Sequence, residues 1–459
     1  MSTFDLSTRR RIHVVGIGGA GMSAIATVLV GMGHDVRGSD LKDSVALDRL
    51  RGLGVRTFLG HDSSHVADAE ILAVSSAIPA DNSEVVMARE NGLPVIARSD
   101  LLAAVCARRR TIAVSGTHGK TTTSSMLALI LVEAGLRPSF IVGGDIYEFG
   151  ANAAWDEGEW LVVEADESDG TFLVLPKEIA VITSIEADHL DHFGTEEELK
   201  RAFGRFANEA LECVVSIDDP VAHSVAPDGA TSFGFAAGAD LRIVGFSPQR
   251  SKARFLLERI DEESIPVELA VPGRHNARNA AAASAAALAI GVDARRIAPA
   301  LARFGGVARR FEFRGELNGA TVIDDYAHLP GEVAAAIDAA KDGGFRRIVC
   351  VFQPHRYSRV AALGAAFADA FVDADEIVIT DIFAAWETPL PGVSGRVIYD
   401  AVRDAHPQLA LAYVPERSEL AEIVRELVGP GDCLLMLGAG DITEITAQLL
   451  EREGAPTAR

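Results

Sequence analysis

Short, largely apolar runs alternate with longer amphipathic or alanine-rich stretches along the whole chain. The runs at 11–15, 111–115 and 432–437 are examples, and each is followed by a glycine-containing turn and a helical pattern. Continuous apolar runs are typical of strands buried on both faces of a parallel sheet, with helices as the crossover connections. The pattern therefore predicts an α/β protein with largely parallel sheets and flanking helices.

The same strand–turn–helix unit recurs at the start, in the middle and near the end of the chain. Its turns are Gly16–Gly21, Gly116–Thr122 and Gly438–Asp441, and the helices that follow are expected to end near Gly31, Gly135 and Glu451. A chain of 459 residues suggests about three domains. Each unit then marks one sheet.

Two segments are candidate domain boundaries. One is the arginine-rich Ala107–Arg110, directly before the second unit, and the other is Gly305-Gly306. The second follows an alanine-rich helical segment that begins around Asn276 and breaks at Gly291. We expect domains at residues 1–107, 108–305 and 306–459.

Composition and charge narrow the functional classes. The 43 basic and 65 acidic residues give a net charge of −22, which argues against a general nucleic-acid-binding protein. Cys106, Cys213, Cys350 and Cys433 lie far apart without a C-x-x-C pair, so buried reduced thiols are expected. No apolar run approaches the ~18 residues of a membrane span. We expect a cytoplasmic enzyme.

The first glycine turn fits a dinucleotide-binding pattern. Gly16, Gly18 and Gly21 match G-x-G-x-x-G, and Asp40 follows near the end of the next expected strand. Such glycines let the backbone approach a diphosphate at the start of a helix. The pattern does not select NAD, because a UDP-sugar diphosphate uses the same amides. A tight turn without a ligand is the alternative.

The second turn, in the stretch AVSGTHGKTTTSS, resembles a phosphate-binding loop but is shorter than G-x-x-x-x-G-K-[ST]. Its backbone amides can hold phosphate oxygens, Lys120 can contact the β- and γ-phosphates, and Thr121 can bind Mg²⁺. We expect an ATP site. The third turn is a weaker signal, and a helix start capped by Asp441 is expected there.

Two acidic clusters follow strands in the same domain. Glu164–Asp169 follows the run Trp160–Val163, and Glu186–His192 follows Ile179–Ser184. Because ligand sites of α/β proteins lie at the carboxyl ends of strands, these oxygen ligands with one imidazole favour Mg²⁺ or Mn²⁺. The alternative for either cluster alone is a solvated acidic loop.

Eight strings in family order resemble those of the Mur ligases. They are GIGGAGMS, SGTHGKTTT, EADESDGTF, EADHLDHFG, PGRHNARNA, DDYAHLPGEV, FQPHRYSR and GAGDI, and they extend from residue 16 to 442. The resemblance implies three domains: an N-terminal Rossmann-like domain for a UDP-sugar, a central P-loop ATPase-like domain, and a C-terminal Rossmann-like ligase domain.

The resemblance also implies a reaction and its partners. In the alanine-adding branch, ATP activates the carboxylate of UDP-N-acetylmuramate as an acyl phosphate, and L-alanine displaces phosphate to form an amide during bacterial peptidoglycan precursor synthesis. Mg²⁺ is the expected cofactor, with Mn²⁺ as a substitute. A monomer or homodimer in the cytoplasm is expected, without nucleic-acid or membrane partners.

Residue by residue, the resemblance implies four groups of contacts. The ATP contacts are Gly116, Thr117, His118, Gly119, Lys120, Thr121, Thr122, Asn276 and Asp325. The UDP-sugar contacts are Gly16, Gly18, Gly19, Gly21 and Asp40, and the amino-acid contacts are Tyr326, His328, His355, Arg356 and Arg359. The metal ligands are Thr121, Glu164 and His189, and the catalytic residues are Lys120, Glu164 and His189.

One string departs from the alanine-adding pattern. Where that branch has D-D-Y-G-H-H-P, this chain has Ala327 and Leu329 in the glycine and second histidine positions. Ala327 is expected in the related recycling ligase, which attaches the tripeptide L-alanyl-γ-D-glutamyl-meso-diaminopimelate to UDP-N-acetylmuramate, whereas FQPHRYSR favours the alanine-adding branch. The first glycine turn taken alone would also suit an NAD-dependent oxidoreductase. A non-catalytic ATP-binding module is a further alternative.

Overall fold

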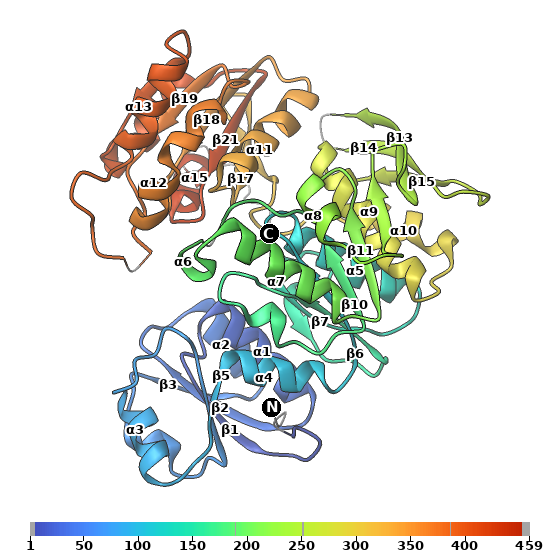
Figure 1. Ribbon diagram of the computed structural model, residues 1–459. Helices are drawn as coiled ribbons and strands as arrows, with labels where there is room; N and C mark the ends of the chain where they lie inside the picture. The colour runs from blue at the N-terminus through green and yellow to red at the C-terminus, as the bar shows by residue number, and fades with distance from the viewer. Residues whose placement is uncertain (1–4, 189, 250–251, 386, 452–459) are drawn as a thin grey trace. The chain divides into compact units, whose positions relative to one another are not determined.

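The computed structural model describes residues 5–188, 190–249, 252–385 and 387–451. It confirms a three-domain α/β protein whose described strands form three sheets (Figure 1). Two compact units make up the chain. Unit 1 contains Met1–Val244, Leu256–Val267 and Arg278–Phe304, and unit 2 contains Gly245–Phe255, Glu268–Ala277 and Gly305–Arg459. The domain boundaries at 107/108 and 305/306 stay predictions.

The N-terminal sheet is parallel and has the order β3-β2-β1-β4-β5. Its strands are β1 Arg11–Val15, β2 Asp35–Asp40, β3 Arg56–Leu59, β4 Ile71–Val74 and β5 Val95–Ala97. Helices α1 Ala20–Gly31, α2 Val45–Gly52 and α4 Arg98–Cys106 share one buried core with β1, while α3 Ser83–Glu90 and the 3-10 helix η1 Ser63–Val66 pack on the other face. The chain reverses direction across the sheet at β1, so the Gly16 turn lies where such folds bind ligands.

The central sheet has the order β15-β14-β13-β12-β11-β10-β6-β9-β7-β8. Its strands are β6 Arg110–Ser115, β7 Ser139–Ile146, β8 Ala151–Ala154, β9 Trp160–Glu164, β10 Ile179–Ile182, β11 Glu212–Ser216, β12 Thr231–Gly234, β13 Leu241–Pro248, β14 Ala253–Glu258 and β15 Ile265–Leu269. Strand β6 pairs in parallel with both β9 and β10. This places the second glycine loop between the two acidic clusters.

Helices cover the central sheet. They are α5 Lys120–Glu133, η2 Thr171–Leu173, α6 Leu190–Phe193, α7 Glu196–Asn208, α8 Pro220–Val225, α9 Arg274–Ala289, η3 Ala294–Arg296 and α10 Ile297–Arg303. All residues of α5 from Thr121 to Leu131 are buried, so this helix is fixed on every side. Helix α9 ends at Ala289, and Gly291 follows with a φ of +82°, as the sequence break predicts.

The C-terminal sheet has the order β16-β17-β21-β18-β19-β20, parallel except for the β16–β17 pair. Its strands are β16 Glu312–Leu317, β17 Ala320–Asp325, β18 Arg347–Phe352, β19 Glu376–Ile379, β20 Ala410–Tyr413 and β21 Asp432–Leu437. One face packs on α11 Pro330–Asp342, α12 Tyr357–Leu363, η4 Gly364–Asp369 and α13 Arg396–Ala405, and the other on α14 Arg417–Leu427 and α15 Ile442–Glu451.

The four cysteines, Asp441 and the apolar runs were each singled out by the sequence pattern. The four cysteines are free and buried, and burial raises the pKa of the Cys106 thiol to about 12. Asp441 does not cap α15 among the described contacts: its carboxylate accepts from Gln353 at 2.7 Å and from Arg417 at 2.5 Å. Within the described ranges, none of the helices has the length and apolar character to cross a membrane.

Candidate active site

The second glycine loop joins the end of β6 to the start of α5 and is folded against the end of β10. Gly116 and Gly119 have φ values of +133° and +81°, a region that favours glycine. A Cβ on Gly116 would lie 2.3 Å from Thr183 Oγ1 and 2.8 Å from the Ser184 backbone nitrogen. The Thr117 and His118 amides donate to Ser184, at 2.9 Å and 3.0 Å. The loop therefore needs glycine for its shape.

Lys120 lies at the first position of α5 and points back into the loop. Its Nζ donates to the Gly116 carbonyl at 2.7 Å and to Glu167 Oε1 at 2.7 Å, and the Glu167 side chain is only 2% exposed. Burial lowers the pKa of Lys120, but the carboxylates of Glu167 and Asp166 outweigh it, so the pKa lies above its ordinary value. The residue is a fixed cation inside a glycine loop.

Hard oxygen donors lie beside this lysine. Thr121 Oγ1 donates to Glu164 Oε1 at 3.1 Å, and the Gly143 amide donates to Glu164 Oε2 at 2.6 Å. The β6–β9 register, in which Val114 is opposite Glu164, brings the strand ends together. Thr122 is buried in the same first turn of α5. The two predicted metal ligands Thr121 and Glu164 are thus neighbours, while His189 lies outside the described residues.

The second acidic cluster also contacts the loop. The Glu186 amide donates to Thr117 Oγ1 at 2.8 Å, and His118 Nε2 lies 3.0 Å from Glu186 Oε2. In the part of the chain that the structure describes, His, Cys, Asp and Glu side chains form no metal-binding group of three or more.

The first glycine turn is tied to the end of β2. The amides of Gly16 and Ile17 donate to the Ser39 carbonyl at 2.8 Å and 3.1 Å, and the Gly18 amide donates to Asp40 Oδ2 at 2.9 Å. Gly19 precedes α1, and a Cβ on Gly21 would lie 3.1 Å from Arg98 Nη1. The five predicted UDP-sugar contacts therefore lie together: four glycines in the turn, and Asp40 at the end of β2, which accepts a hydrogen bond from the turn.

Arg98 is a further contact of the first turn. Its Nη2 donates to Asp169 Oδ2 at 2.8 Å, within the first acidic cluster. Arg98 begins α4, and its guanidinium lies between the glycine turn and that cluster.

The two other predicted ATP contacts belong to unit 2. Asn276, in the first turn of α9, donates from Nδ2 to the Pro272 carbonyl at 2.7 Å. Asp325 ends β17 and accepts from the amides of Phe311 at 2.6 Å and Ala327 at 2.7 Å. Burial, only partly offset by Arg310, raises the pKa of Asp325 to about 6.

Four of the predicted amino-acid contacts lie together in unit 2 and are called the ring cluster below. They are the rings of Tyr326, His328 and His355 and the guanidinium of Arg359. The ring of His328 contacts Tyr326 edge-on at 5.5 Å and His355 at 5.7 Å, measured between centroids. Arg359 Nη1 lies 3.1 Å from His355 Nδ1. Burial, helped by Arg359, lowers the pKa of His328 to about 4 and that of His355 to about 3. Both rings are therefore neutral near pH 7.

Arg356 and Leu329 frame this cluster. Arg356 precedes α12 with a φ of +69°, an uncommon conformation for a residue with a side chain, and its amide donates to the Phe383 carbonyl at 2.9 Å. Leu329 is buried, at 4% exposure, at the start of α11.

Three segments of the chain match sequence models of one protein family. Residues 11–110, 114–287 and 309–440 match the models described as "Mur ligase family, catalytic domain", "Mur ligase middle domain" and "Mur ligase, glutamate ligase domain". The chain belongs to the Mur ligase family.

Relatives within the family include proteins of similar length. The UDP-N-acetylmuramate–L-alanine ligase of Anaeromyxobacter sp. (strain Fw109-5) is 45% identical over 98% of this chain and 99% of its own. The crystal structure of the UDP-N-acetylmuramate-alanine ligase of Thermotoga maritima has a TM-score of 0.82 at 30% identity, covering 97% of this chain and 99% of that one. A murein peptide ligase from Psychrobacter arcticus, at 23% identity and a TM-score of 0.70, covers 98% of this chain and all of that one, and shares the fold.

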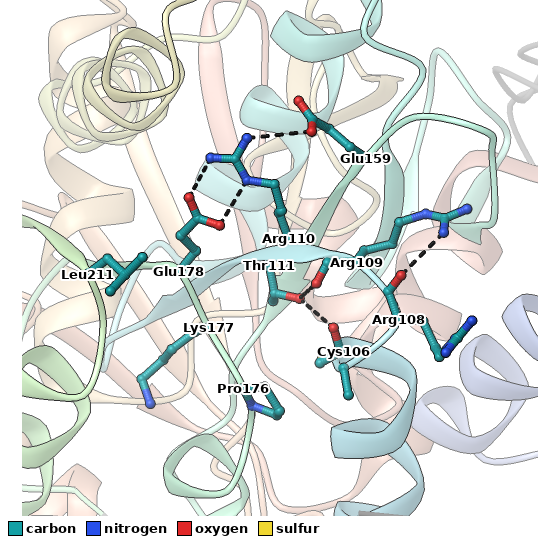
Figure 2. A pocket seen from close by; sticks show the side chains of 11 residues that line it. Cys106, Arg108, Arg109, Arg110, Thr111, Glu159, Pro176, Lys177, Glu178 and Leu211 are labelled. Atoms are coloured by element: carbon teal, nitrogen blue, oxygen red, sulfur yellow. Dashed lines mark hydrogen bonds and ion pairs between the residues drawn. The ribbon is translucent and has the colours of Figure 1, made fainter. Parts of the chain in front are cut away.

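A cavity of about 670 Å³ in this Mur ligase lies away from the predicted site (Figure 2). Its lining residues include Arg110, Lys177 and Leu211, which lie at the amino ends of β6, β10 and β11, opposite to the glycine loop. Arg110 forms two hydrogen bonds with Glu178, at 2.8 Å and 2.5 Å, and stacks on Trp160 at 4.1 Å. These contacts hold the strand starts together. Because the cavity lies at the amino ends of the strands and the glycine loop at their carboxyl ends, we do not assign the cavity to ATP.

Sequence analysis of this Mur ligase missed the role of Glu167. It was one of several acids in the Glu164–Asp169 cluster, and the contact with Lys120 joins residues 47 positions apart. The available signal was its place directly after a strand that neighbours the phosphate loop. That signal selects the cluster but not the residue.

Proposed function

We propose that this Mur ligase joins L-alanine to the carboxylate of UDP-N-acetylmuramate at the expense of ATP, in the assembly of bacterial peptidoglycan precursors. The observation that carries the proposal is the full-length similarity to a ligase of that name, 45% identical over 98% of this chain. ATP is the co-substrate, consistent with a loop that has two glycines of positive φ and is followed by a lysine whose Nζ donates to the Gly116 carbonyl.

Lys120 is proposed to contact the β- and γ-phosphates. Its Nζ is already oriented by Gly116 and Glu167, so little reorganisation is needed when the phosphates arrive. Amides of the loop from Gly116 to Thr122, other than those of Thr117 and His118 that donate to Ser184, are proposed to bind phosphate oxygens. Asn276 and Asp325 are proposed ATP contacts on the resemblance alone.

The donors beside Lys120 fit a hard divalent cation. A carboxylate at Glu164 and a hydroxyl at Thr121, 3.1 Å apart, are the oxygen ligands that Mg²⁺ prefers, and Mn²⁺ accepts the same set. We propose that these two side chains, with His189, would hold Mg²⁺. When bound, the ion would neutralise part of the phosphate charge.

The reaction is proposed to have two steps. A carboxylate oxygen of the muramate attacks the γ-phosphorus, the bond to the β-phosphate oxygen breaks, and ADP leaves. The amine of L-alanine then attacks the acyl carbon, inorganic phosphate leaves with the carboxylate oxygen, and the amine loses a proton to solvent or a base. Because the muramate carboxylate, ATP and the reaction intermediate are all anionic, the protein contributes chiefly positioning and charge stabilisation.

The other two substrates are assigned to the glycine turn and the ring cluster. The diphosphate of the UDP-sugar is proposed to bind at the start of α1, with the turn Gly16–Gly21 held in shape by Ser39 and Asp40. The L-alanine carboxylate is proposed to bind Arg356 or Arg359, and the neutral rings of His328 and His355 face the same cluster.

Phosphate release tests this proposal against the recycling activity. UDP-N-acetylmuramate and ATP are incubated with either L-alanine or the tripeptide L-alanyl-γ-D-glutamyl-meso-diaminopimelate. Release with L-alanine alone supports the proposal, whereas release with the tripeptide alone would assign the chain to the less supported recycling ligase. A cytoplasmic location and a monomeric or homodimeric state are also proposed, and light scattering of the purified protein distinguishes the two states.

A further inference from the structure

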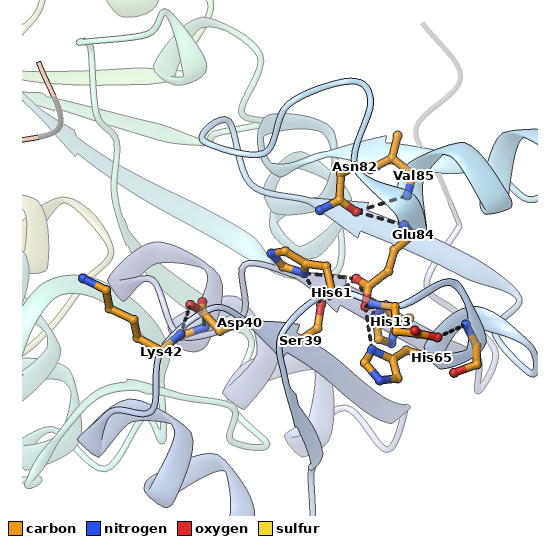
Figure 3. Close-up of polar contacts among 12 residues, drawn as sticks. His13, Ser39, Asp40, Lys42, His61, His65, Asn82, Glu84 and Val85 are labelled. Carbon is orange, nitrogen blue, oxygen red and sulfur yellow. Dashed lines mark hydrogen bonds and ion pairs between the residues drawn. The ribbon is translucent and has the colours of Figure 1, made fainter. Parts of the chain in front are cut away.

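A buried carboxylate outside the assigned contacts, that of Glu84, is bonded to Ser39 near the end of β2 (Figure 3). Glu84 belongs to the first turn of α3 and has a side-chain exposure of 0%. Figure 3 shows imidazoles of His13, His61 and His65 arranged around it. The residue comes from a helix on the opposite face of the sheet from α1.

Both oxygens of Glu84 accept hydrogen bonds. Ser39 Oγ donates to Oε2 at 2.5 Å, and His13 Nε2 lies 3.3 Å from the same oxygen. The Asp62 amide donates to Oε1 at 3.2 Å, and His65 Nδ1 lies 2.7 Å from it. Burial raises the pKa of Glu84, but the hydrogen bonds from His13 and Ser39 outweigh it and bring the pKa down to about 2. The group is a carboxylate at neutral pH.

The charge of Glu84 fixes the direction of every bond around it. An ionised carboxylate only accepts, so His13 Nε2, His65 Nδ1 and Ser39 Oγ each carry the shared proton. Because the single hydroxyl proton of Ser39 is used in this way, His61 Nδ1, 3.0 Å away, donates to Ser39 Oγ. The three rings and the hydroxyl thus have one arrangement.

Ser39 connects this network to the glycine turn. Its hydroxyl is bound to Glu84, while its carbonyl accepts from the amides of Gly16 at 2.8 Å and Ile17 at 3.1 Å. The next residue, Asp40, holds the Gly18 amide at 2.9 Å. The end of β2 therefore sets the turn, and Glu84 holds the end of β2.

A core role alone does not require a charge at this position. An apolar residue would fill the same space between β1, β2 and the segment after β3 without the desolvation of an ion. A carboxylate with four directed bonds instead sets the position of three chain segments that approach the carboxyl edge of the sheet, where a ligand binds.

We propose that Glu84 is a positioning residue of the UDP-sugar site, which acts through Ser39 on the backbone amides of the first glycine turn. This rests on the proposed function, in which that turn binds the UDP-sugar diphosphate. Glu84 does not contact the substrate. Its substitution therefore affects binding of one substrate and not the chemistry at the second loop.

Glu84→Gln is the primary test, with Glu90→Gln as the matched control. Glutamine keeps the shape but directs an NH₂ group toward the hydroxyl and imidazole donors. Glu90 lies in the same helix, is exposed, and loses the same charge when substituted. We expect Glu84→Gln to raise the KM for UDP-N-acetylmuramate by about tenfold, with kcat and the KM for ATP within roughly twofold of the parent. Glu90→Gln should behave as the parent.

Calorimetric titration with UDP-N-acetylmuramate, in the absence of ATP, should show the same weakening. A structural role alone would reduce kcat through loss of folded enzyme and leave both KM and affinity unchanged, and this result would overturn the proposal. If Glu84→Gln does not fold, Ser39→Ala decides, because it removes only the hydroxyl. An unchanged KM in that variant would equally overturn the proposal. A parent protein that fails to bind UDP-N-acetylmuramate would instead contradict the proposed function.

Discussion

Lys120 and Glu167 form an ion pair that is largely buried. The 2.7 Å contact joins a phosphate-loop cation to a carboxylate that is 2% exposed. We predict that Lys120→Ala lowers kcat/KM for ATP by about 10²–10³-fold, because a cation is lost from a site where phosphate charge develops. UDP-N-acetylmuramate binding should be retained.

The Lys120 variant also leaves Glu167 buried without its partner, which costs stability on its own. Lys120→Ala combined with Glu167→Gln removes that unpaired charge and serves as the control. Steady-state rates of phosphate release measure the effect in both variants. Turnover close to that of the parent in either variant would remove Lys120 from the ATP site.

Arg359 is predicted to determine how tightly L-alanine binds. Its Nη1 lies 3.1 Å from His355 Nδ1, so the guanidinium is oriented by a neutral ring. Lysine cannot reproduce the two-pronged contact with a carboxylate. Arg359→Lys should raise the KM for L-alanine by about tenfold and leave the KM for ATP unchanged. Arg403→Lys, on the exposed side of α13, is the control, and equal shifts for both substrates would contradict the assignment.

The half-buried imidazoles of unit 2 predict a pH dependence of stability. The pKa is about 4 for His328 and about 3 for His355, chiefly because of burial, against an ordinary value of 6.5. From pH 6.5 down to about 4 the unfolded chain binds more protons, so each ring lowers the free energy of unfolding as the pH falls. Asp325, with a pKa raised by burial to about 6, acts in the opposite direction.

The contribution of one ring is obtained by removing it. The thermal midpoint of His355→Gln should fall less between about pH 7 and pH 5 than that of the parent, since the variant lacks one group that the unfolded state protonates. Circular dichroism at both pH values measures the two midpoints. Parallel decreases in parent and variant would show that the folded-state pKa of His355 is not depressed.

At the scale of single elements, the β6–loop–α5 unit tolerates no side chain at Gly116. An added Cβ would lie 2.8 Å from backbone atoms of Ser184, which cannot rotate away. Gly135, after α5, has a φ of +77° but open space around it. Gly116→Ala should therefore lower the thermal midpoint and the ATP affinity more than Gly135→Ala, which carries backbone strain alone. Equal effects of the two substitutions would contradict the close packing of the loop.

Elements that depend on local pattern were predictable from the sequence. The runs at 11–15 and 432–437 are strands β1 and β21 with those bounds, and the predicted helix ends near Gly31 and Glu451 coincide with those of α1 and α15. Burial on both faces produces the apolar runs, and glycine marks the turns. The run expected at Ile179–Ser184 ends earlier, at Ile182, because Thr183 and Ser184 instead bond to the phosphate loop.

Contacts between distant segments were not predictable in the same way. Glu84 meets His13 across 71 positions and Ser39 across 45, and nothing in the local pattern of α3 distinguishes it from the exposed Glu90. The partners of Asp441 are likewise distant in sequence, since the side chains of Arg417 and Gln353 donate to its carboxylate. Residue type and strand position select a cluster, whereas tertiary packing selects the partner.

For the whole molecule, a net charge of −22 contrasts with the proposed substrates, since UDP-N-acetylmuramate and ATP are anionic and L-alanine carries a carboxylate. The structure resolves the contrast locally: Lys120 lies inside the phosphate loop, Arg98 beside the first glycine turn, and Arg359 in the ring cluster. Each cation is oriented by a neighbouring carboxylate or imidazole. Catalysis by this Mur ligase is therefore expected to depend on a few positioned cations rather than on a basic surface.

ATP is expected to activate the muramate carboxylate before L-alanine attacks it. Transfer of isotope from that carboxylate to phosphate measures this order of events. UDP-N-acetylmuramate labelled with ¹⁸O in the carboxylate is incubated with ATP, Mg²⁺, L-alanine and the protein, and the products are analysed by mass spectrometry. We expect UDP-N-acetylmuramoyl-L-alanine together with inorganic phosphate that carries the label. Unlabelled phosphate, or no amide product with L-alanine, would contradict it.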